Sequence, residues 1–398
     1  MKLRIGAIFK DEFSYVIEWL AWHQLAGFEN FTIADNGSSD RTLALLEALE
    51  SLNMIDMMYQ PRVAGNAQLT AYRRMCEKYV GESIGILFID ADEFLVHESM
   101  VDGAEYQELL GLMTDVNTGM VGINWRCFGS SGLEKKDDRL VLERFTACNS
   151  DTISGKNGHL KSATKPAYAY QVGPHISYLY PPYKRKSVDG KDLTEFVRFE
   201  SGVAVKEAGM PEGIAKNIVS GPLRINHYVI KSKEEFVSKK LNRGDAMGGD
   251  AFKKDFSYFN AHDFSDEKFN FPAKKLERLK QNIAALNSKI EASIFAAKLI
   301  GAVDKSNEKF ISGWICSQTG EHIAASVVVY VNGIMQGKVR AGYLRPDLKE
   351  KGLSESGMCG FYFHHQAYLK VGDEVEVKVF GNHCNLMGLR KTIIGSGQ

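Results

Sequence analysis

Two aspartates one residue apart, Asp90 and Asp92, follow the apolar run at residues 84–89. A run of this length and composition is typical of a buried strand, and alternate residues of a strand point to the same side. Two carboxylates held so close repel each other unless a cation lies between them. The simplest such cation is Mg²⁺ or Mn²⁺ that carries a phosphate group. A D-x-D pair also occurs in plain turns, so the rest of the sequence has to decide between the two interpretations.

Two other polar residues lie in or after apolar runs of the same kind. Asp35 follows the strand-like residues 31–34, and its carboxylate could accept a hydrogen bond from a nucleobase N–H or a ribose hydroxyl. His227 lies in the strand-like run 223–230, and a neutral imidazole suits Mn²⁺ as a third ligand beside carboxylates. Basic side chains after it could screen a diphosphate leaving group, although a solvated helix face is the more ordinary role of such residues. They are Lys231, Lys239 and Arg243.

Aromatic residues could bind a sugar, because its C–H face packs well on a flat ring. Trp125 precedes a Gly- and Ser-rich segment and is the expected sugar contact. Trp19 and Trp22 fall in a predicted helix and are expected in the core instead. His175 follows a proline and is expected either at the sugar acceptor or as the metal ligand in place of His227.

The sequence does not decide which residue deprotonates an acceptor hydroxyl. Glu93 adjoins the D-x-D pair, where it either acts as the base or orients the turn. Asp137, Asp138 and Glu143 follow the Gly- and Ser-rich segment and are the alternatives. Glu143 lies in an apolar, strand-like run at 140–145, which favours a structural role. Glu93 and Asp138 are the leading candidates.

Apolar periodicity predicts the elements that hold these side chains. Strands alternate with helices in the N-terminal part, which predicts a parallel sheet with right-handed crossovers. Ligands of such sheets bind at the carboxyl ends of the strands, the edge at which Asp35 and the D-x-D pair fall. Asp11 and Asp40 are expected to cap the first two helices. The predicted strands are 3–9, 31–34, 54–59 and 84–89, and the predicted helices are 11–26, 40–52 and 66–80.

A different pattern begins near Val303. Short strand-like runs with Gly-rich turns, among them 326–331 and the strictly alternating 374–379, predict a β-sandwich. Asn332-Gly333 is a hairpin signal. A long helix is predicted over about 273–299, and its apolar seam could pair with a second copy, although packing on its own domain is more common. The expected domains are 1–250 (catalytic α/β), 251–302 (helical extension) and 303–398 (β-sandwich).

Composition excludes several classes of protein. The 398 residues suggest two or three domains, and 44% hydrophobic with 25% charged residues is ordinary for a soluble protein. Lys+Arg and Asp+Glu both number 49, which argues against a nucleic-acid binder. No apolar stretch is long enough to span a membrane, and the N-terminal run is too short for a signal peptide. Six scattered cysteines indicate reduced thiols and a cytoplasmic location.

Taken together, the motifs resemble the nucleotide-sugar glycosyltransferases of GT-A fold, most closely a family-2-like and family-92-like bacterial branch. The resemblance covers about residues 1–250, where several motifs occur in the right order. The C-terminal part resembles an accessory β-domain of some bacterial transferases. The motifs of the catalytic part are Lys10-Asp11-Glu12 with Glu18, Trp19 and His23; Asp35 to Asp40; Asp90 to Phe94; Trp125 with Phe128 to Gly132; and Asn226-His227-Tyr228 with Lys231, Ser232, Glu235, Phe236, Lys239, Arg243 and Gly244.

The resemblance implies a role for single residues. Asp35 would contact the nucleotide base, usually uracil, and Asp90 would contact the ribose and the metal. Asp92 would hold Mn²⁺ (or Mg²⁺), with His227 as the metal-binding histidine. The residues that align loosely with the stretch closing over the base are Gln68, Tyr72 and Arg73.

The implied reaction moves a hexose of galactose or glucose type from a UDP-sugar to a hydroxyl of a glycan or glycolipid acceptor. Inversion at the anomeric carbon is expected, in surface-polysaccharide or lipopolysaccharide synthesis. Basic segments such as 184–186 would suit peripheral contact with an anionic inner membrane. Two alternatives stay open: a non-catalytic glycan-binding or scaffold protein, and a nucleotidyltransferase. The latter would usually carry a Gly-rich basic loop after the first strand, where this chain has Lys10-Asp11-Glu12.

Overall fold

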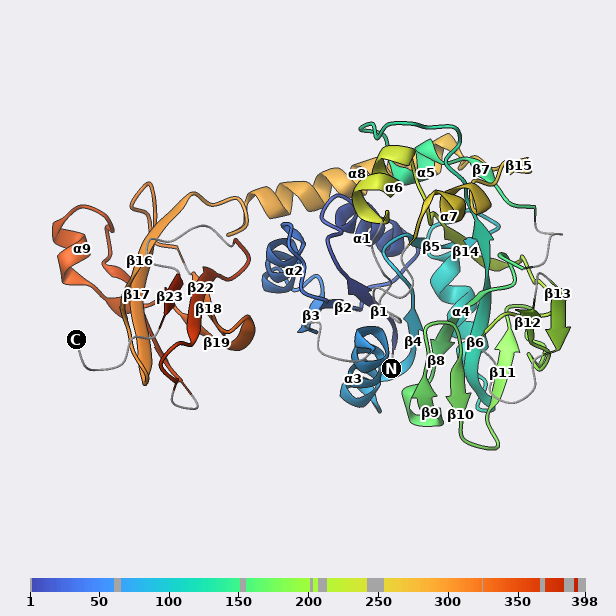
Figure 1. Cartoon of the computed structure of the whole chain (residues 1–398), viewed down its shortest axis with the longest axis horizontal. Coiled ribbons are helices and arrows are strands. Elements are labelled where there is room, and N and C mark those ends of the chain that lie inside the picture. The colour runs from blue at the N-terminus through green and yellow to red at the C-terminus, as the bar shows by residue number, and fades with distance from the viewer. Residues whose placement is uncertain are drawn as a thin grey trace. The chain divides into compact units, whose positions relative to one another are not determined.

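The computed structural model (Figure 1) describes most of the chain, and the protein divides by its internal contacts into two compact units. The first unit comprises Met1–Ser38 and Arg62–Leu286, and the second comprises Ser39–Pro61 and Asn287–Gln398. Arg243, predicted to contact a diphosphate, lies outside the described residues. The described residues are 2–60, 66–150, 155–200, 203–206, 213–241, 254–323, 325–365, 369–382 and 390–392.

A mixed sheet forms the centre of the first unit, so the predicted α/β class is confirmed. Its strand order is β2-β1-β4-β8-β6-β14-β5, and β11 pairs with β6. The pairings β1–β2, β1–β4, β6–β14 and β6–β11 are parallel, whereas β8 and β5 run antiparallel to their neighbours. The strands are β1 (Lys2–Phe9), β2 (Phe31–Asp35), β4 (Ser83–Phe88), β5 (Glu93–His97), β6 (Thr118–Cys127), β8 (Leu160–Thr164), β11 (Lys184–Ser187) and β14 (Leu223–His227).

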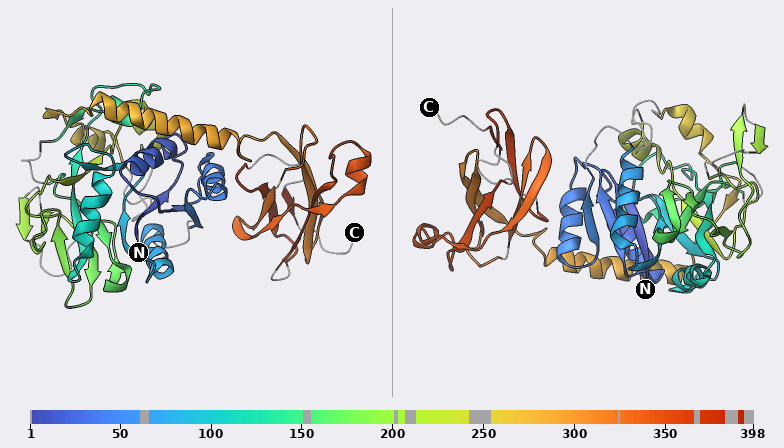
Figure 2. Two further views of the ribbon diagram at one scale, coloured as in Figure 1. Left: turned by 180° about the vertical axis from the view of Figure 1, so that it is seen from behind. Right: turned by 90° about the horizontal axis from the view of Figure 1, so that it is seen from below.

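Helices cover this sheet (Figure 2). The helix α3 packs against β1 and β4, α4 packs against β5, β6 and β14, and α1 packs against β5. The helices are α1 (Val16–Leu25), α3 (Ala67–Tyr79), α4 (Ala104–Thr114), α5 (Val141–Arg144), α6 (Lys233–Lys239), α7 (Phe256–Ala261) and α8 (Ala273–Glu291), with a 3₁₀ turn at Pro166–Tyr168. Short strands complete the unit: β7 (Ala147–Cys148), β9 (Ala169–Val172), β10 (Ser177–Leu179), β12 (Val197–Glu200), β13 (Val203–Lys206) and β15 (Glu267–Lys268).

Three local predictions are wrong. The helix predicted over about 273–299 ends at Glu291, and Leu299 begins a strand. The first helix begins at Val16 rather than at Asp11, because Asp11 has a left-handed φ of 55° and its N–H donates to Ser38 Oγ. Residues 140–145 contain the short helix α5 instead of a strand. The carboxylate of Glu18 accepts from the N–H groups of Val141 and Leu142 at 2.9 and 3.2 Å, which stabilises the first turn of α5.

The second unit contains a β-sandwich, as the pattern of short strands predicts. Two four-stranded sheets, β16-β17-β21-β20 and β19-β18-β22-β23, contribute side chains to one apolar core. Positive φ at Asn332 and Gly333 confirms the hairpin turn between β18 and β19. The strands are β16 (Leu299–Ser306), β17 (Phe310–Ser317), β18 (Ser326–Val331), β19 (Ile334–Arg340), β20 (Tyr343–Leu344), β21 (Met358–His364), β22 (Glu374–Val379) and β23 (Arg390–Thr392), with helix α9 (Pro346–Glu350).

Residues far from the sandwich in sequence also belong to the second unit. They form α2 (Thr42–Ser51) and β3 (Asp56–Tyr59). The buried carboxylate of Glu47 accepts from Tyr59 Oη at 2.5 Å and from the N–H of Gly381 at 2.6 Å. The second unit is therefore discontinuous in sequence, which the apolar pattern near Val303 does not reveal.

Strand register brings the predicted site residues to one edge of the sheet. Phe9 pairs with Asp35, and Gly6 pairs with Phe88, two residues before Asp90. Asp35 and the D-x-D pair therefore flank the carboxyl end of β1, as the alternation of strands and helices predicts. Within the described part of the chain, no helix combines the length and apolar character needed to cross a bilayer.

Candidate functional site

The carboxylates of the D-x-D pair bind two different lysines. Asp90 Oδ2 lies 2.6 Å from Lys161 Nζ, and Asp92 Oδ2 lies 2.7 Å from Lys240 Nζ. Lys161 belongs to β8 and has no exposed surface, whereas the side chain of Lys240 is 23% exposed at the end of α6. Each lysine neutralises one carboxylate, which lowers the repulsion expected between the pair.

Two residues of α3 hold the other oxygen of Asp90. Gln68 Nε2 donates to Asp90 Oδ1 at 3.1 Å, and Tyr72 Oη lies at 3.5 Å from the same atom. Gln68 and Tyr72 thus lie beside Asp90, and their predicted contact with a nucleotide base stays a prediction. Arg73, on the exposed side of α3, lies 3.6 Å from Glu77 instead. It forms no hydrogen bond or ion pair with Asp90 among the described residues.

Glu93 is enclosed beneath the D-x-D turn (residues 89–93). Its Oε2 accepts from the N–H of Asp90 at 2.8 Å and lies 3.1 Å from Lys161 Nζ. Burial raises the pKa of Glu93, and Asp90 and Asp92 raise it further against the lowering effect of Lys161. Because Glu93 has no exposed surface, this geometry favours the second of its two predicted roles, that of orienting the turn.

Asp92 and His227 form the closest pair of candidate metal ligands. His227 Nε2 lies 3.6 Å from Asp92 Oδ1, and Asp92 directly precedes β5, whose first residue, Glu93, pairs with His227. Burial lowers the pKa of His227 well below its usual range and keeps the imidazole neutral. Burial would raise the pKa of Asp92, but Lys240, His227 and Lys231 outweigh it and hold the pKa well below its usual range.

The fit to a divalent metal differs among the three predicted ligands. Adjacent ligands in an octahedral Mg²⁺ or Mn²⁺ site lie about 3 Å apart, so Asp92 and His227 need only a small movement to share an ion. Both oxygens of Asp90 already accept from protein donors, namely Gln68 and Lys161. In the part of the chain that the structure describes, no group of three or more His, Cys, Asp or Glu residues is placed to hold a metal. Asp92 and His227 are the two predicted ligands close enough to share such an ion, which would need its further ligands from outside this pair.

Trp125 lies among three imidazoles. Its ring centroid is 4.8 Å from that of His159, 5.2 Å from that of His175 and 4.2 Å from that of His227. His175 Nδ1 lies 3.0 Å from Leu160 O, and burial lowers its pKa to about 3. The structure thus brings Trp125, His175 and His227 together.

Asp35 keeps one carboxylate oxygen unused. Its Oδ2 accepts from the N–H groups of Gly37 and Ser38 at 2.9 and 3.1 Å. Its Oδ1 is buried, and no donor among the described residues reaches it. Burial raises the pKa of this carboxyl. A buried oxygen without a partner is costly in the free protein, and a ligand N–H would satisfy it.

Three lysine ammonium groups surround the ring of Tyr15. Lys136, Lys231 and Lys239, here called the lysine cluster, lie 5.1, 4.5 and 4.4 Å from its centroid. Lys239 Nζ is paired with the carboxylate of Glu12 at 2.5 Å. The π-electrons of the tyrosine ring attract the three ammonium groups through cation–π interactions.

Lys231 is the unusual member of the lysine cluster. It is only 5% exposed, its backbone has a left-handed φ of 58°, and its ammonium lies against the Tyr15 ring without a hydrogen bond or ion pair to another described side chain. Burial lowers its pKa to about 8, with Asp92 acting in the opposite direction. A buried, strained and unpaired cation is expensive to maintain, so this position is suited to an anion.

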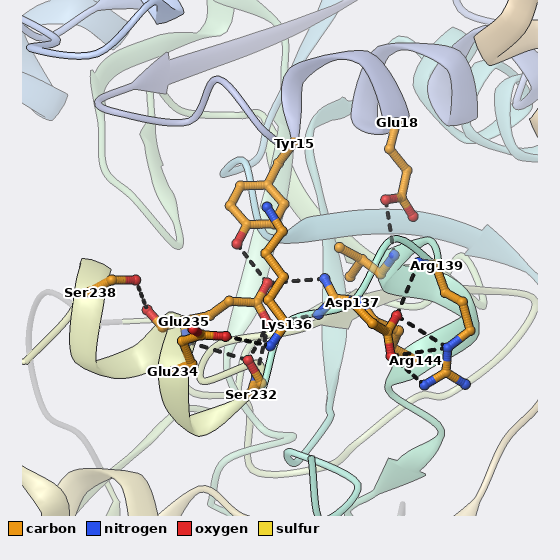
Figure 3. A network of polar contacts seen from close by, with 11 residues as sticks. Tyr15, Glu18, Lys136, Asp137, Arg139, Arg144, Ser232, Glu234, Glu235 and Ser238 are labelled. Atoms are coloured by element: carbon orange, nitrogen blue, oxygen red, sulfur yellow. Dashed lines mark hydrogen bonds and ion pairs between the residues drawn. The ribbon is translucent and has the colours of Figure 1, made fainter. Parts of the chain in front are cut away.

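A buried ionic network supports Tyr15 from behind (Figure 3). Arg144 donates to both oxygens of Glu235 at 2.7 and 3.0 Å, and Tyr15 Oη donates to Glu235 Oε1 at 2.6 Å. Glu235 also completes a capping box with Ser232 at the start of α6. Lys136 is held nearby because its N–H donates to Glu234 Oε2.

Asp138 lies apart from the D-x-D pair. It is exposed and lines an open pocket with Asp137, Arg139, Leu140, Glu143 and Lys280. No hydrogen bond or ion pair between described residues connects Asp138 with Asp90, Asp92 or His227. Its predicted catalytic role therefore gains no support from the arrangement.

Some residues of the site leave little trace in the sequence. Trp19 Nε1 donates to Asp90 O at 3.0 Å, and Trp22 Nε1 donates to Leu95 O at 2.7 Å, so the two buried tryptophans also fix the D-x-D segment. Lys161 and Lys240 reach it from distant segments. Of the lysines at the site, Lys231 and Lys239 were anticipated from the sequence, as cations for a diphosphate.

Comparisons with known proteins give weak likenesses. No profile of a known protein family matches the chain, and no curated protein matches its sequence. Among solved structures, S. aureus TarS 1-349 in complex with UDP-GlcNAc is 15% identical, with 42% of this chain and 46% of that chain covered and a TM-score of 0.27. S. aureus TarS is 12% identical, with 99% of this chain and 77% of that chain covered and a TM-score of 0.30. The chain spans about half the length of the TarS 1-349 structures, and likenesses at these scores carry no argument on function.

Proposed function

We propose that the protein is a nucleotide-sugar glycosyltransferase of GT-A type that moves a hexose from a UDP-sugar to a glycan or glycolipid hydroxyl. The observation that carries the proposal is the buried oxygen of Asp35 that has no donor among the described residues. Lys231 adds a buried ammonium that lies 4.5 Å from the centroid of the Tyr15 ring. A uracil N–H and a diphosphate complement these two groups in one molecule.

The remaining site residues have roles that follow from their surroundings. Asp90, held by Gln68 and Tyr72, faces the position of the ribose. The lysine cluster attracts the diphosphate, because two of its charges, on Lys136 and Lys231, are not paired with carboxylates among the described residues. The leaving diphosphate gains negative charge in the transition state, and fixed cations stabilise it.

Asp92 and His227 are the residues that would hold Mn²⁺ or Mg²⁺. Such an ion, when bound, neutralises the departing diphosphate as a Lewis acid. Trp125 and His175 line the neighbouring region for the sugar and the acceptor hydroxyl. Glu93 and Asp138 remain the predicted catalytic carboxylates, of which Glu93 is suited to positioning. Inversion, the cytoplasmic location and a place in surface-glycan synthesis belong to the same proposal.

The test is a screen of UDP- and GDP-sugars for release of the nucleotide in the presence of Mn²⁺. We expect release of UDP from one UDP-hexose, loss of this activity in Asp92→Asn, and retention in Lys216→Met, an exposed lysine paired with Glu195. UDP binding measured by calorimetry should depend on Mn²⁺ and weaken at least tenfold in Asp35→Ala. Binding of UDP without any turnover would favour the scaffold alternative, and no binding of any nucleoside diphosphate would overturn the proposal.

A further inference from the structure

We infer that Lys161 is the resident cation of the D-x-D turn and that Asp90, consequently, is not a metal ligand. The inference concerns the protein without its donor, so it stands or falls separately from the proposed function. It assigns to Lys161 the neutralising role that a divalent ion was predicted to play at this carboxylate.

The contacts of Lys161 are those of a fixed cation. Its ammonium lies 2.6 Å from Asp90 Oδ2 and 3.1 Å from Glu93 Oε2. Its side chain, like that of Glu93, has no exposed surface. Strand β8 lies between β4 and β6, with Ser162 paired to Phe88 and Lys161 to Ile123, so the lysine enters from inside the sheet.

Both oxygens of Asp90 already have a protein partner, although its side chain is 35% exposed. Oδ2 takes the ammonium of Lys161, and Oδ1 takes the amide of Gln68 with Tyr72 nearby. A metal at Asp90 would have to displace Lys161. The ammonium would then lose its shorter contact, at 2.6 Å to Asp90, and keep only Glu93 at 3.1 Å in a position without exposed surface, which is unfavourable.

Lys240 provides the contrast at the other carboxylate. It too pairs with its aspartate, at 2.7 Å from Asp92 Oδ2, but its side chain is 23% exposed and it ends helix α6. Lys240 can therefore move into solvent and give Asp92 to an ion, whereas Lys161 cannot leave Asp90. The cation partner of Asp90 is thus fixed, whereas the cation partner of Asp92 can be exchanged.

Lys161 also acts through Glu93 on the shape of the turn. Glu93 Oε2 accepts from the N–H of Asp90 and faces Lys161, so the lysine holds together the carboxylate that closes the turn and the aspartate that begins it. Lys161 is accordingly a positioning residue. Without its charge, Asp90 and Glu93 would be two neighbouring carboxylates with no cation between them.

The first experiment measures Mn²⁺ binding from the electron paramagnetic resonance signal of free Mn²⁺, without nucleotide. We expect Asp90→Asn to change the dissociation constant less than threefold, and Asp92→Asn to raise it at least tenfold. A wild-type protein that binds no Mn²⁺ also denies Asp90 a ligand role. A tenfold loss of affinity in Asp90→Asn overturns the inference.

The second experiment tests whether a divalent ion can replace the lysine. In EDTA, Lys161→Ala should unfold at a lower temperature than wild type. Addition of Mn²⁺ should recover at least half of this decrease in unfolding temperature. Mn²⁺ should not raise the unfolding temperature of the triple variant that combines Lys161→Ala with Glu93→Gln and Asp90→Asn. It should also have no such effect on the double variant that combines Lys240→Ala with Asp92→Asn. Equal Mn²⁺ shifts in Lys161→Ala and in its triple variant would overturn the role of Lys161. If Lys161→Ala does not fold, the Asp90→Asn measurement decides alone.

Discussion

Arg144 and Glu235 meet in a two-pronged ion pair that connects α5 to α6 in the interior of the first unit. The two guanidinium nitrogens lie 2.7 and 3.0 Å from the two carboxylate oxygens. Both side chains are almost fully buried. The same carboxylate accepts from Tyr15 and Ser232, so the pair supports the ring around which the lysine cluster gathers.

Arg144→Met should destabilise the first unit by about 3–5 kcal/mol, because it leaves the Glu235 carboxylate buried without its cation. Urea unfolding followed by tryptophan fluorescence measures this loss. The control is Arg139→Met, which removes an exposed ion pair with Asp137 and should cost less than about 1 kcal/mol. Equal losses in the two variants would contradict the proposed importance of burial.

Glu18 should make stability fall as pH rises. Burial raises the pKa of Glu18 from its ordinary value of 4.5 to about 7 in the folded protein. Between these two values the folded state holds the proton more tightly than the unfolded state, so the stabilising contribution is complete below pH 4.5 and is lost through pH 7. The change amounts to about 3 kcal/mol. Glu18→Gln should flatten this part of the curve of unfolding free energy against pH, and an unchanged slope would refute the assignment.

Lys231→Met should weaken UDP binding about tenfold and leave uridine binding unchanged, because the ammonium is proposed to contact the diphosphate alone. Calorimetric titration with both ligands separates the two effects. Lys216→Met, which removes an exposed lysine, should change neither. A parallel loss of uridine affinity would show that Lys231 acts on the fold of the site instead.

Gly313→Ala should destabilise the β-sandwich by about 1–3 kcal/mol. A Cβ at this position would lie 2.2 Å from Ala302 O and 2.6 Å from the ring of Phe361, and the backbone oxygen cannot move aside. Gly342→Ala in the same unit meets nothing within 4 Å and should be close to neutral. Thermal unfolding of the two variants measures the difference, and equal midpoints would show that the sheet adjusts.

Apolar periodicity is sufficient to predict the edge of the sheet but not the partners of its carboxylates. Strands β1, β2 and β4 come from short apolar runs, and their ends place Asp35 and the D-x-D pair correctly. Lys161 could not be predicted, because a single lysine among the buried residues of β8 has no pattern and its partners lie far away in the sequence. Tertiary hydrogen bonds to Ser38 and Glu18 also overrode the local preferences at Asp11 and at residues 140–145.

The contact between Glu47 and Gly381 has a consequence for the order in which the protein matures on the ribosome. Residues 39–61 are synthesised early, but the strands with which they pack are synthesised last. The carboxylate of Glu47 therefore stays solvated until nearly the whole chain has emerged from the ribosome. The second unit closes only as a late step of biosynthesis, and a fragment beginning at residue 303 would leave the N–H of Gly381 without its acceptor.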